Sequence, residues 1–378
     1  MSPAELERVR GLRQVAARKG TARRRVWRTP ERLPRQARLI ADESTGSFLG
    51  RLAQLNHMPL EDLMGLVGEG GKAMQPRYTE VYLNPGALER LAALTARGPE
   101  VLQRALPSLA PHRLLEAGPG PVWRWPQWEA KDVFLVRACD LCAAARRHPS
   151  DVYLVSVTRW RVCARHHRWL DNLCEDGATW LPLQNVPEVV RAHRDRARLE
   201  RRLGAGGRAL FADALHITAL WWNIPALSPP AWQARGRLLG EEAGGDLRLA
   251  PLVSYPETMR LAWMLAGRER RRMRGTWSVE HDRAWLAAVG AMLEEWQMPA
   301  ALALAPVEIW MQHHSMPTLH RSVNRPVQGK WRRLPAPHPH EDVSSGAHLE
   351  RLTCLPWRFG DEPPEADETM VWSVAGRA

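Results

Sequence analysis

Two pairs of potential metal ligands lie close together in the middle of the chain. The first pair is Cys139 and Cys142, and the second is Cys163 with either His166 or His167. Thiolate sulfur and imidazole nitrogen suit Zn²⁺, and a structural zinc site takes four such ligands in a tetrahedron. Two Cys-x-x-Cys/His pairs about twenty residues apart have the spacing of such a site. The pattern therefore predicts one structural zinc ion held by three cysteines and one histidine.

The alternative is that these cysteines are ordinary buried thiols. The chain has five cysteines, and three of them fall in this one window at ligand spacing, which favours the metal site. Cys174 follows alone, and because one cysteine cannot make a second site, we expect it to be a buried free thiol. So few cysteines, three of them at metal spacing, indicate a reducing compartment, and we expect a cytoplasmic protein.

The ligand pairs need a scaffold that brings them together. Each pair must lie on a tight turn, and the chain between them must return the second turn to the first. The apolar segment 152–157 favours a short β-hairpin for this return. In so small a module few other apolar groups can be buried, so we expect Trp160 and Trp169 to pack over the metal site.

Helical periodicity surrounds this module on both sides. Helix starts are indicated at Ser44, Pro59, Asn84 and Pro99, and Ser254 to Glu257 has the pattern of a capping box. The first group of helices is compatible with a helix-turn-helix and equally with any small helical bundle. We predict a mainly α fold with five parts: a largely disordered basic arm (1–32), an N-terminal helical, helix-turn-helix-like domain (33–117), a zinc-finger module (118–182), a C-terminal helical domain (183–334) and a largely disordered tail (335–378).

The charge of the chain points to an anionic partner. The net charge is +12 and the isoelectric point is near 10.3, which is typical of proteins that bind nucleic acid. All but four of the 53 basic residues are arginine, so part of the excess can reflect a GC-rich genome. The charge is nevertheless concentrated, because residues 1–40 hold twelve basic against three acidic side chains. No run of eighteen apolar residues is present, so no membrane span is expected.

The candidates for contact with DNA phosphates lie in three basic segments, namely the arm, the zinc module and the helix expected over 187–203. For each segment the competing interpretation is a solvated or disordered basic surface. No phosphate-binding loop, nucleophile elbow or zinc-protease motif occurs, so we expect no enzymatic activity. The candidate residues are Arg23, Arg24, Arg25, Arg146, Arg147, Arg165, Arg194 and Arg198.

Three stretches of the chain resemble the TniQ family, which comprises target-selection proteins of bacterial transposons. The first is Leu33-Pro34 followed by Glu43-Ser44 and Ser47-Phe-Leu-Gly-Arg-Leu-Ala53, and the second is the segment 83–95. The third is the finger itself, with Cys139-x-x-Cys142, Trp160, Cys163-x-x-His166 and Leu170. The resemblance covers about residues 33–180. It differs from the family pattern at Asp140, where a proline is usual, and in the second Cys-x-x-Cys, of which Cys174 alone remains.

The resemblance makes His166 the fourth ligand and places His167 where the family has glycine. It implies a non-catalytic adaptor for transposition, which binds double-stranded DNA or another targeting complex. Such an adaptor recruits an AAA+ ATPase regulator and, through it, the transposase; a homodimer is compatible with this role. The alternatives are a stand-alone DNA-binding transcription regulator derived from a transposon, and a protein-interaction scaffold whose arginines reflect codon bias.

Overall fold

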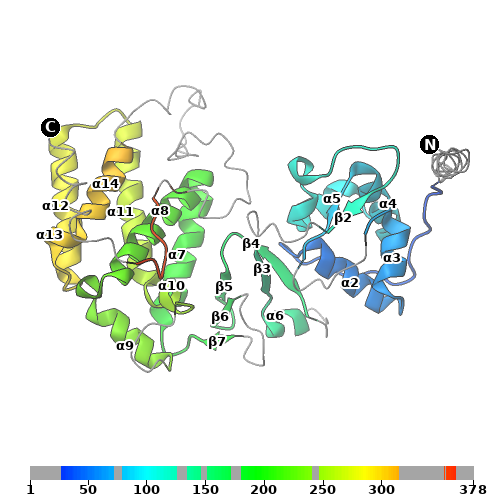
Figure 1. Ribbon diagram of the computed structural model, residues 1–378, viewed down its shortest axis with the longest axis horizontal. Coiled ribbons are helices and arrows are strands. Elements are labelled where there is room, and N and C mark those ends of the chain that lie inside the picture. Colours follow the sequence, from blue (N-terminus) through cyan, green and yellow to red (C-terminus); the bar gives the residue numbers. More distant parts are fainter. Residues whose placement is uncertain are drawn as a thin grey trace, which may run out of the picture.

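In the computed structural model, the chain forms two helical bodies with a small β module between them (Figure 1). The mainly α fold that the sequence predicts is confirmed, and the strands form small antiparallel sheets. None of the helices in the described part of the chain is both long and apolar enough to span a membrane. The structure describes residues 27–71, 79–125, 134–145, 151–171, 180–240, 247–314, 353 and 355–362.

The N-terminal body contains four α-helices around one apolar core. Phe48, Leu49 and Leu52 are fully buried at its centre. A two-stranded sheet, β1 (Tyr82–Leu83) with β2 (Trp123–Arg124), closes one side. The helices are α2 (Thr45–Leu55), α3 (Leu60–Val67), α4 (Pro85–Thr95) and α5 (Pro99–Ala105), followed by the 3-10 turns η1 (Pro107–Leu109) and η2 (Pro111–Arg113).

The helix starts in this body follow from local capping chemistry. The Ser44 hydroxyl accepts a hydrogen bond from the Ser47 amide at 3.0 Å and caps α2. The Asn84 side chain accepts from the Ala87 amide at 2.9 Å and caps α4, whose first residue is a proline. Both interactions satisfy a backbone donor that the helix leaves unpaired. These two starts agree with the sequence prediction.

One carboxyl group, that of Glu80, is buried in this core. Glu80 is 6% exposed, and its Oε1 accepts hydrogen bonds from the amides of Val81 (2.7 Å), Thr45 (2.9 Å) and Gly46 (3.3 Å). Burial disfavours the carboxylate more than these bonds favour it, and the pKa of Glu80 rises to about 7. The folded state therefore binds the proton more tightly than the unfolded state, in which the pKa is about 4.5.

This shift predicts a pH-dependent loss of stability. The contribution of Glu80 is fully present below pH 4.5 and is lost as the pH rises to about 7, by roughly 3 kcal/mol in total. Glu80→Gln removes this titration, so the variant should not lose this stability as the pH rises. The difference in unfolding free energy, variant minus wild type, should therefore increase between pH 5 and pH 8. Urea unfolding at both pH values measures this. Glu61→Gln, at an exposed position, is the control, and a difference that does not vary with pH would contradict the prediction.

The β module consists of two small antiparallel sheets. In the first, β3 (Phe134–Arg137) pairs with β4 (Tyr153–Ser156), and the short helix α6 (Asp140–Ala144) follows β3. In the second, the order is β5 (Trp160–Cys163), β6 (Arg168–Asp171) and β7 (Leu181–Pro182). The sequence predicts a short hairpin in the chain between the two ligand pairs. The apolar segment 152–157 does form a strand there, β4, but it pairs with β3, which precedes the first cysteine pair, and β5 belongs to the second sheet.

The C-terminal body is a helical bundle. Helices α7, α8 and α11 pack against one another, and every side chain of α8 from 211 to 220 is buried. The remaining helices lie around this group (Figure 1). Its elements are α7 (Pro187–Leu203), α8 (Ala205–Asn223), η3 (Pro225–Leu227), α9 (Pro230–Leu238), α10 (Ala250–Val253), α11 (Tyr255–Met273), α12 (Val279–Glu295), α13 (Ala300–Ala303) and α14 (Ala305–His313).

The predicted capping box at Ser254 is wrong, although α11 does begin there. The Ser254 hydroxyl donates to the carbonyl of Ala250 at 2.8 Å, because α10 ends directly before it. Glu257 does not bend back to the helix start. Its carboxylate pairs with Arg235 at 3.0 Å and accepts from the Trp232 indole at 3.0 Å, so α9 and α11 are joined by a buried ion pair.

The packing predicted for Trp160 and Trp169 is also wrong. The two rings stack on each other at 4.3 Å between centroids, but they belong to the core of the C-terminal body. Trp160 makes an edge contact with Tyr255 of α11, with the centroids 5.1 Å apart. The tryptophans thus join the second sheet of the module to the helical bundle. The cysteines instead cluster with buried Val136 and Leu170 and with partly buried Phe134 and Trp180.

The module also contacts the N-terminal body, through strand β4. The Ser44 amide donates to the carbonyl of Tyr153 at 2.9 Å, and the Val155 amide donates to the carbonyl of Asp42 at 2.8 Å. Glu43 forms an isolated bridge with Leu154. The segment just before α2 therefore lies along the edge of β4 as a short third strand would.

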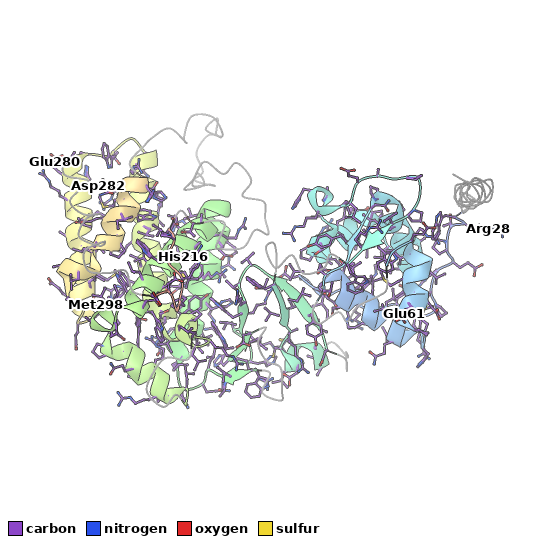
Figure 2. All side chains as sticks on the ribbon, in the orientation of Figure 1. Arg28, Glu61, His216, Glu280, Asp282 and Met298 are labelled. Atoms are coloured by element: carbon purple, nitrogen blue, oxygen red, sulfur yellow. The ribbon has the colours of Figure 1, made fainter. Side chains whose placement is uncertain are left out.

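A segment near the end of the chain returns to the C-terminal body. Leu355 and Trp357 are buried in its core. The Asn223 side-chain amide donates to the carbonyl of Arg358 at 2.6 Å, and the Gly360 amide donates to Asn223 Oδ1 at 2.9 Å. Beside them His216 lies within this body (Figure 2).

Candidate metal centre and nucleic-acid interface

The four predicted ligands converge on one point. His166 Nδ1 lies 3.3 Å from Cys139 Sγ, 3.2 Å from Cys142 Sγ and 3.5 Å from Cys163 Sγ. The sulfur atoms of Cys142 and Cys163 are 3.7 Å apart. All four donor atoms lie within 4.8 Å of one another, so the cluster could hold one metal ion.

These separations fit the edges of a metal-centred tetrahedron. With metal–sulfur bonds of about 2.3 Å and metal–nitrogen bonds of about 2.0 Å, the sulfur–sulfur edges are about 3.8 Å and the sulfur–nitrogen edges about 3.5 Å. The Cys142–Cys163 separation of 3.7 Å and the three separations from His166 match these values. The side chains are therefore arranged for tetrahedral coordination by three sulfurs and one nitrogen.

The electrostatics of the cluster favour a cation. Burial, reinforced by the adjacent Cys163 sulfur, raises the pKa of Cys142 to about 12. Burial also raises the pKa of Cys139. Three thiolates so close together repel one another, whereas a divalent ion at the centre stabilises the deprotonated sulfurs that bind it.

Local backbone structure places each ligand. Cys139 is the residue before α6 and Cys142 lies within its single turn, while Cys163 ends β5. His166 and His167 lie in the turn that leads into β6. His167 adopts a left-handed conformation with φ 51°, and its carbonyl accepts from the Leu183 amide at 2.8 Å.

The turn therefore distinguishes the two histidines. His166 joins the sulfur cluster, and His167 occupies a backbone position at which glycine is the least strained residue. This explains in physical terms why the resemblance aligns His167 with a glycine.

Polar contacts around the cluster hold the turn that carries Cys139 and Cys142 in place. The Asp140 carboxylate accepts from the Leu141 amide at 2.8 Å and forms an ion pair with Arg168 of β6. The Arg168 guanidinium also lies 3.7 Å from the centroid of the Trp180 ring. Asp140, the position at which the chain departs from the usual proline, thus ties α6 to the strand that follows the second ligand pair.

Comparison with known proteins identifies the part of the chain that holds this cluster. Residues 34–170 match the family model described as TniQ. The chain carries a TniQ domain. The match begins at Pro34, before α2, and ends within β6, so the TniQ domain includes all four converging side chains. No curated protein and no solved structure matches the chain.

The predicted DNA-contacting arginines are placed as follows. Arg165 is exposed on the turn of the TniQ domain that carries His166. Arg194 and Arg198 are exposed on α7, beyond the end of the TniQ match. One Arg194 nitrogen donates to the carbonyl of Ala164 at 3.4 Å, so α7 and the Arg165 turn are adjacent. Five candidates lie outside the described residues: Arg23, Arg24, Arg25, Arg146 and Arg147.

Helix α7 carries a wider basic surface than these two residues. Six of its residues are exposed, and at about 100° per residue they fall within an arc of roughly 100°. We call the five arginines in this arc the α7 arginine face: Arg191, Arg194, Arg198, Arg201 and Arg202.

The acidic side chains of α7 are already engaged. Asp195 pairs with Arg198 at 2.7 Å, Glu200 pairs with Arg196 at 2.7 Å, and Glu188 pairs with Arg235 at 3.1 Å. Among the described residues, no carboxylate lies within 4.0 Å of the guanidinium of Arg191, Arg194, Arg201 or Arg202. The face therefore has an uncompensated positive charge.

Arg196 shows that an arginine in a basic helix need not lie on its exposed face. It is 7% exposed, and its guanidinium lies 4.1 Å from the Phe211 ring centroid and 5.5 Å from that of Trp160. The sequence prediction treats all the arginines of 187–203 as one basic surface, and it therefore wrongly includes the buried Arg196. The 3.6-residue period of the helix places Arg196 on the face opposite the exposed arginines. The same period places Arg191, Arg201 and Arg202 on the exposed face together with Arg194 and Arg198.

Proposed function

We propose that the protein is a zinc-containing DNA-binding adaptor that selects the target site for transposition. It acts without a catalytic step of its own and recruits an AAA+ ATPase regulator, which brings the transposase. The observation that carries this proposal is the TniQ match over residues 34–170, which includes a tetrahedral Cys₃His cluster. The protein acts in the cytoplasm, where the chromosomal target lies.

The donor set supports zinc as the metal. Three thiolates and one imidazole in a tetrahedron suit Zn²⁺, and four protein ligands leave no open position for a reacting water. The ion is then structural. It fixes the turn that carries Arg165 and the short helix that carries Asp140.

The distribution of charge supports duplex DNA as the partner. The α7 arginine face extends along a helix of 17 residues, about 26 Å long. Its uncompensated guanidinium groups, with Arg165 of the adjacent turn, form one basic surface that spans the module and the C-terminal body. Such a surface suits the phosphates of a DNA backbone, which position a protein without reading sequence.

The salt dependence of DNA binding tests this interface. The triple substitution of Arg191, Arg194 and Arg201 by alanine should reduce the slope of log K against log salt by about 2.7, that is 0.9 for each lost phosphate contact. Fluorescence anisotropy with a labelled 25-base-pair duplex, between 50 and 300 mM salt, measures the slope. The melting temperature should change little, since these side chains are exposed.

A matched control removes the same charge elsewhere. Arg104, Arg237 and Arg283 are exposed on α5, α9 and α12, and none forms an ion pair with another described residue. Their triple alanine variant should keep the wild-type slope. Equal slopes in the two triple variants would show that net charge, and not the α7 arginine face, determines DNA binding.

Recruitment distinguishes an adaptor from a stand-alone DNA-binding regulator. An adaptor should form a complex with the ATPase that is encoded beside a TniQ-type gene, and this complex should assemble on target DNA in the presence of ATP. Size-exclusion chromatography with and without the duplex measures it. A protein that binds DNA but no such ATPase would be a regulator, and one that binds no duplex even at low salt would be an interaction scaffold.

A further inference from the structure

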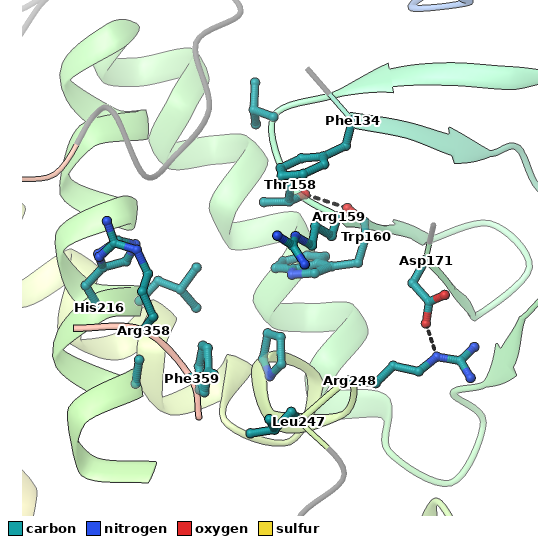
Figure 3. Close-up of a pocket in the computed structure, with 14 residues that line it drawn as sticks. Phe134, Thr158, Arg159, Trp160, Asp171, His216, Leu247, Arg248, Arg358 and Phe359 are labelled. Carbon is teal, nitrogen blue, oxygen red and sulfur yellow. Dashed lines mark hydrogen bonds and ion pairs between the residues drawn. The ribbon is translucent and has the colours of Figure 1, made fainter. Parts of the chain in front are cut away.

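A cavity of about 480 Å³ lies where the β module meets the C-terminal body. Its walls come from the β4–β5 turn, from α8, from the segment before α10 and from the returning segment at Arg358 and Phe359 (Figure 3). The volume is within the range of small-molecule binding pockets.

Aromatic rings and guanidinium groups line the cavity together. The rings belong to Phe134, Trp160 and Phe359, and they come from three separate parts of the chain. Val157, Leu215 and Ala219 supply apolar surface between them. A planar ring inserted here would contact aromatic and aliphatic groups, which is the environment in which nucleobases stack on proteins.

The charge of the lining is positive. Arg248 is paired with Asp171, the one acidic residue among the described residues that line the cavity, so this carboxylate is neutralised. The Arg358 guanidinium donates to the carbonyls of Leu355 and Pro356 at 3.0 and 2.9 Å and lies 2.6 Å from His216 Nδ1. These contacts hold the two guanidinium groups in the wall.

Arg159 differs from the other two arginines. It is exposed, and its guanidinium lies 5.3 Å from the centroid of the Phe134 ring, while no carboxylate of the described residues lies within ion-pair distance. Figure 3 shows its side chain beside Phe134 and Trp160. A cation beside two rings can meet the phosphate that accompanies a stacked base.

The position of the cavity connects it with the proposed DNA surface. Trp160 begins β5, and Cys163 ends it, so the cavity and the Arg165 turn lie at opposite ends of a four-residue strand. That strand is about 10 Å long. The cavity therefore lies one short strand away from the turn that carries Arg165.

We propose that this cavity receives one unstacked nucleobase of a DNA strand, with Arg159 binding the adjoining phosphate. The inference rests on the proposed DNA binding and deepens it, because it assigns the protein a preference for DNA in which a base has left the helix. The shared chemistry is that of a nucleotide, and the same site could take a free mononucleotide. An acidic peptide with an aromatic side chain is a different partner, and it would show no preference between the bulged and the paired duplex as competitors.

Two duplexes of the same length test the proposal. One is fully paired, and the other carries a single extrahelical base at its centre. Wild-type protein should bind the bulged duplex roughly tenfold more tightly, since stacking of one base on aromatic side chains contributes an effect of this order. A third duplex, with an abasic residue in the bulge, separates stacking from the flexibility of the bulge and should bind like the paired duplex. Anisotropy at fixed salt measures all three affinities.

Two variants assign the preference to the cavity. Ala219→Phe fills it from α8, and Arg159→Glu reverses the exposed charge at its mouth without touching the core. Each should abolish the preference for the bulged duplex, and Ala219→Phe should keep the affinity for the paired one. Arg283→Glu, on the exposed surface of α12, is the charge control and should keep the preference. If Ala219→Phe does not fold, as judged by circular dichroism, Arg159→Glu and its control decide the question.

The outcomes separate this inference from the proposed function. Equal affinity of the wild type for bulged and paired duplexes overturns the nucleobase pocket and leaves the DNA-binding proposal intact. Absence of binding to either duplex at low salt overturns both. Competition with deoxyadenosine monophosphate tests whether the ligand is a base within DNA or a free nucleotide. Loss of the preference for the bulged duplex at millimolar mononucleotide supports a site that also accepts a free nucleotide. A preference that survives both cavity variants overturns the assignment to this cavity.

Discussion

Substitution of Cys163 by serine should abolish stoichiometric metal binding and unfold the β module. The reason is that the apolar cluster described beside the sulfur atoms is small: Val136, Cys139 and Leu170 are buried in it, and Phe134 and Trp180 are partly buried against it. Metal binding in such modules contributes on the order of 10 kcal/mol to folding, because the site forms only when the chain around it is folded. Elemental analysis of the purified protein measures the metal. Hydrogen exchange resolved by peptide measures the loss of protection, which should be concentrated in residues 134–145 and 151–171.

The control for this prediction is Cys354→Ser, which changes a cysteine far from the cluster in the chain. This variant should keep one zinc per chain and a wild-type exchange pattern. Chelation of the wild type should reproduce the exchange pattern of Cys163→Ser. A Cys163→Ser protein that retains one equivalent of zinc and normal protection in the module would show that the four side chains are not the metal site.

The second large effect concerns a buried ion pair in the N-terminal body. Arg51 donates to Glu43 Oε1 from its Nε at 2.7 Å and to Oε2 at 2.5 Å, and the two side chains are 2% and 0% exposed. Arg51→Ala leaves the Glu43 carboxylate buried without its partner, which should destabilise the protein by about 3–5 kcal/mol. Burial already raises the pKa of Glu43, so the variant should be least stable at high pH. Urea unfolding at pH 6 and pH 8 measures both effects.

An exposed ion pair supplies the matched control. Arg260 and Glu295 pair at 2.5 Å with side chains 47% and 61% exposed. Glu295→Gln should leave the unfolding midpoint almost unchanged, because exposed pairs are screened by solvent. The double variant Glu43→Leu with Arg51→Met should recover much of the loss from Arg51→Ala, since no buried charge remains. A stable Arg51→Ala protein would show that water reaches Glu43 in the folded state.

The pair also explains part of the sequence pattern on which the resemblance rests. Ser47 donates to Glu43 Oε1 at 2.9 Å and accepts from the Tyr153 amide at 3.0 Å. Glu43, Ser47 and Arg51 are therefore one hydrogen-bonded set that joins α2 to β4. The family resemblance includes these residues, but the sequence does not reveal that a carboxylate and a guanidinium pair in the junction between two parts of the molecule.

The metal cluster was predictable because ligand spacing is a local property. Two residues between paired ligands fit one tight turn, so three of the four ligands followed directly from the sequence. The choice between His166 and His167 depends on the folded backbone: His166 Nδ1 lies beside the three sulfur atoms, whereas His167 is the left-handed residue of the turn, with φ 51°. Spacing alone leaves this choice open.

Features that depend on packing between distant segments were not predictable. Trp160 and Trp169 were expected over the metal because the module is small, but the C-terminal body supplies a larger apolar surface and takes both rings. Glu257 fits a capping box by spacing, yet Arg235 lies close enough to compete for it. In each case a local pattern was overridden by a tertiary partner that lies far away in the sequence.

The two-sided attachment of the β module has a geometric consequence. Strand β4 is hydrogen-bonded to the segment before α2, and the stacked rings of β5 and β6 are embedded in the bundle of α7, α8 and α11. The two sheets are joined to each other where the first and second ligand pairs meet. Contacts between the two sheets therefore set the angle between the two helical bodies, and they include the four converging side chains, the Asp140–Arg168 ion pair and the hydrogen bond from Arg161 to the Val155 carbonyl. A torque that a partner applies to one body is transmitted to the other through this joint.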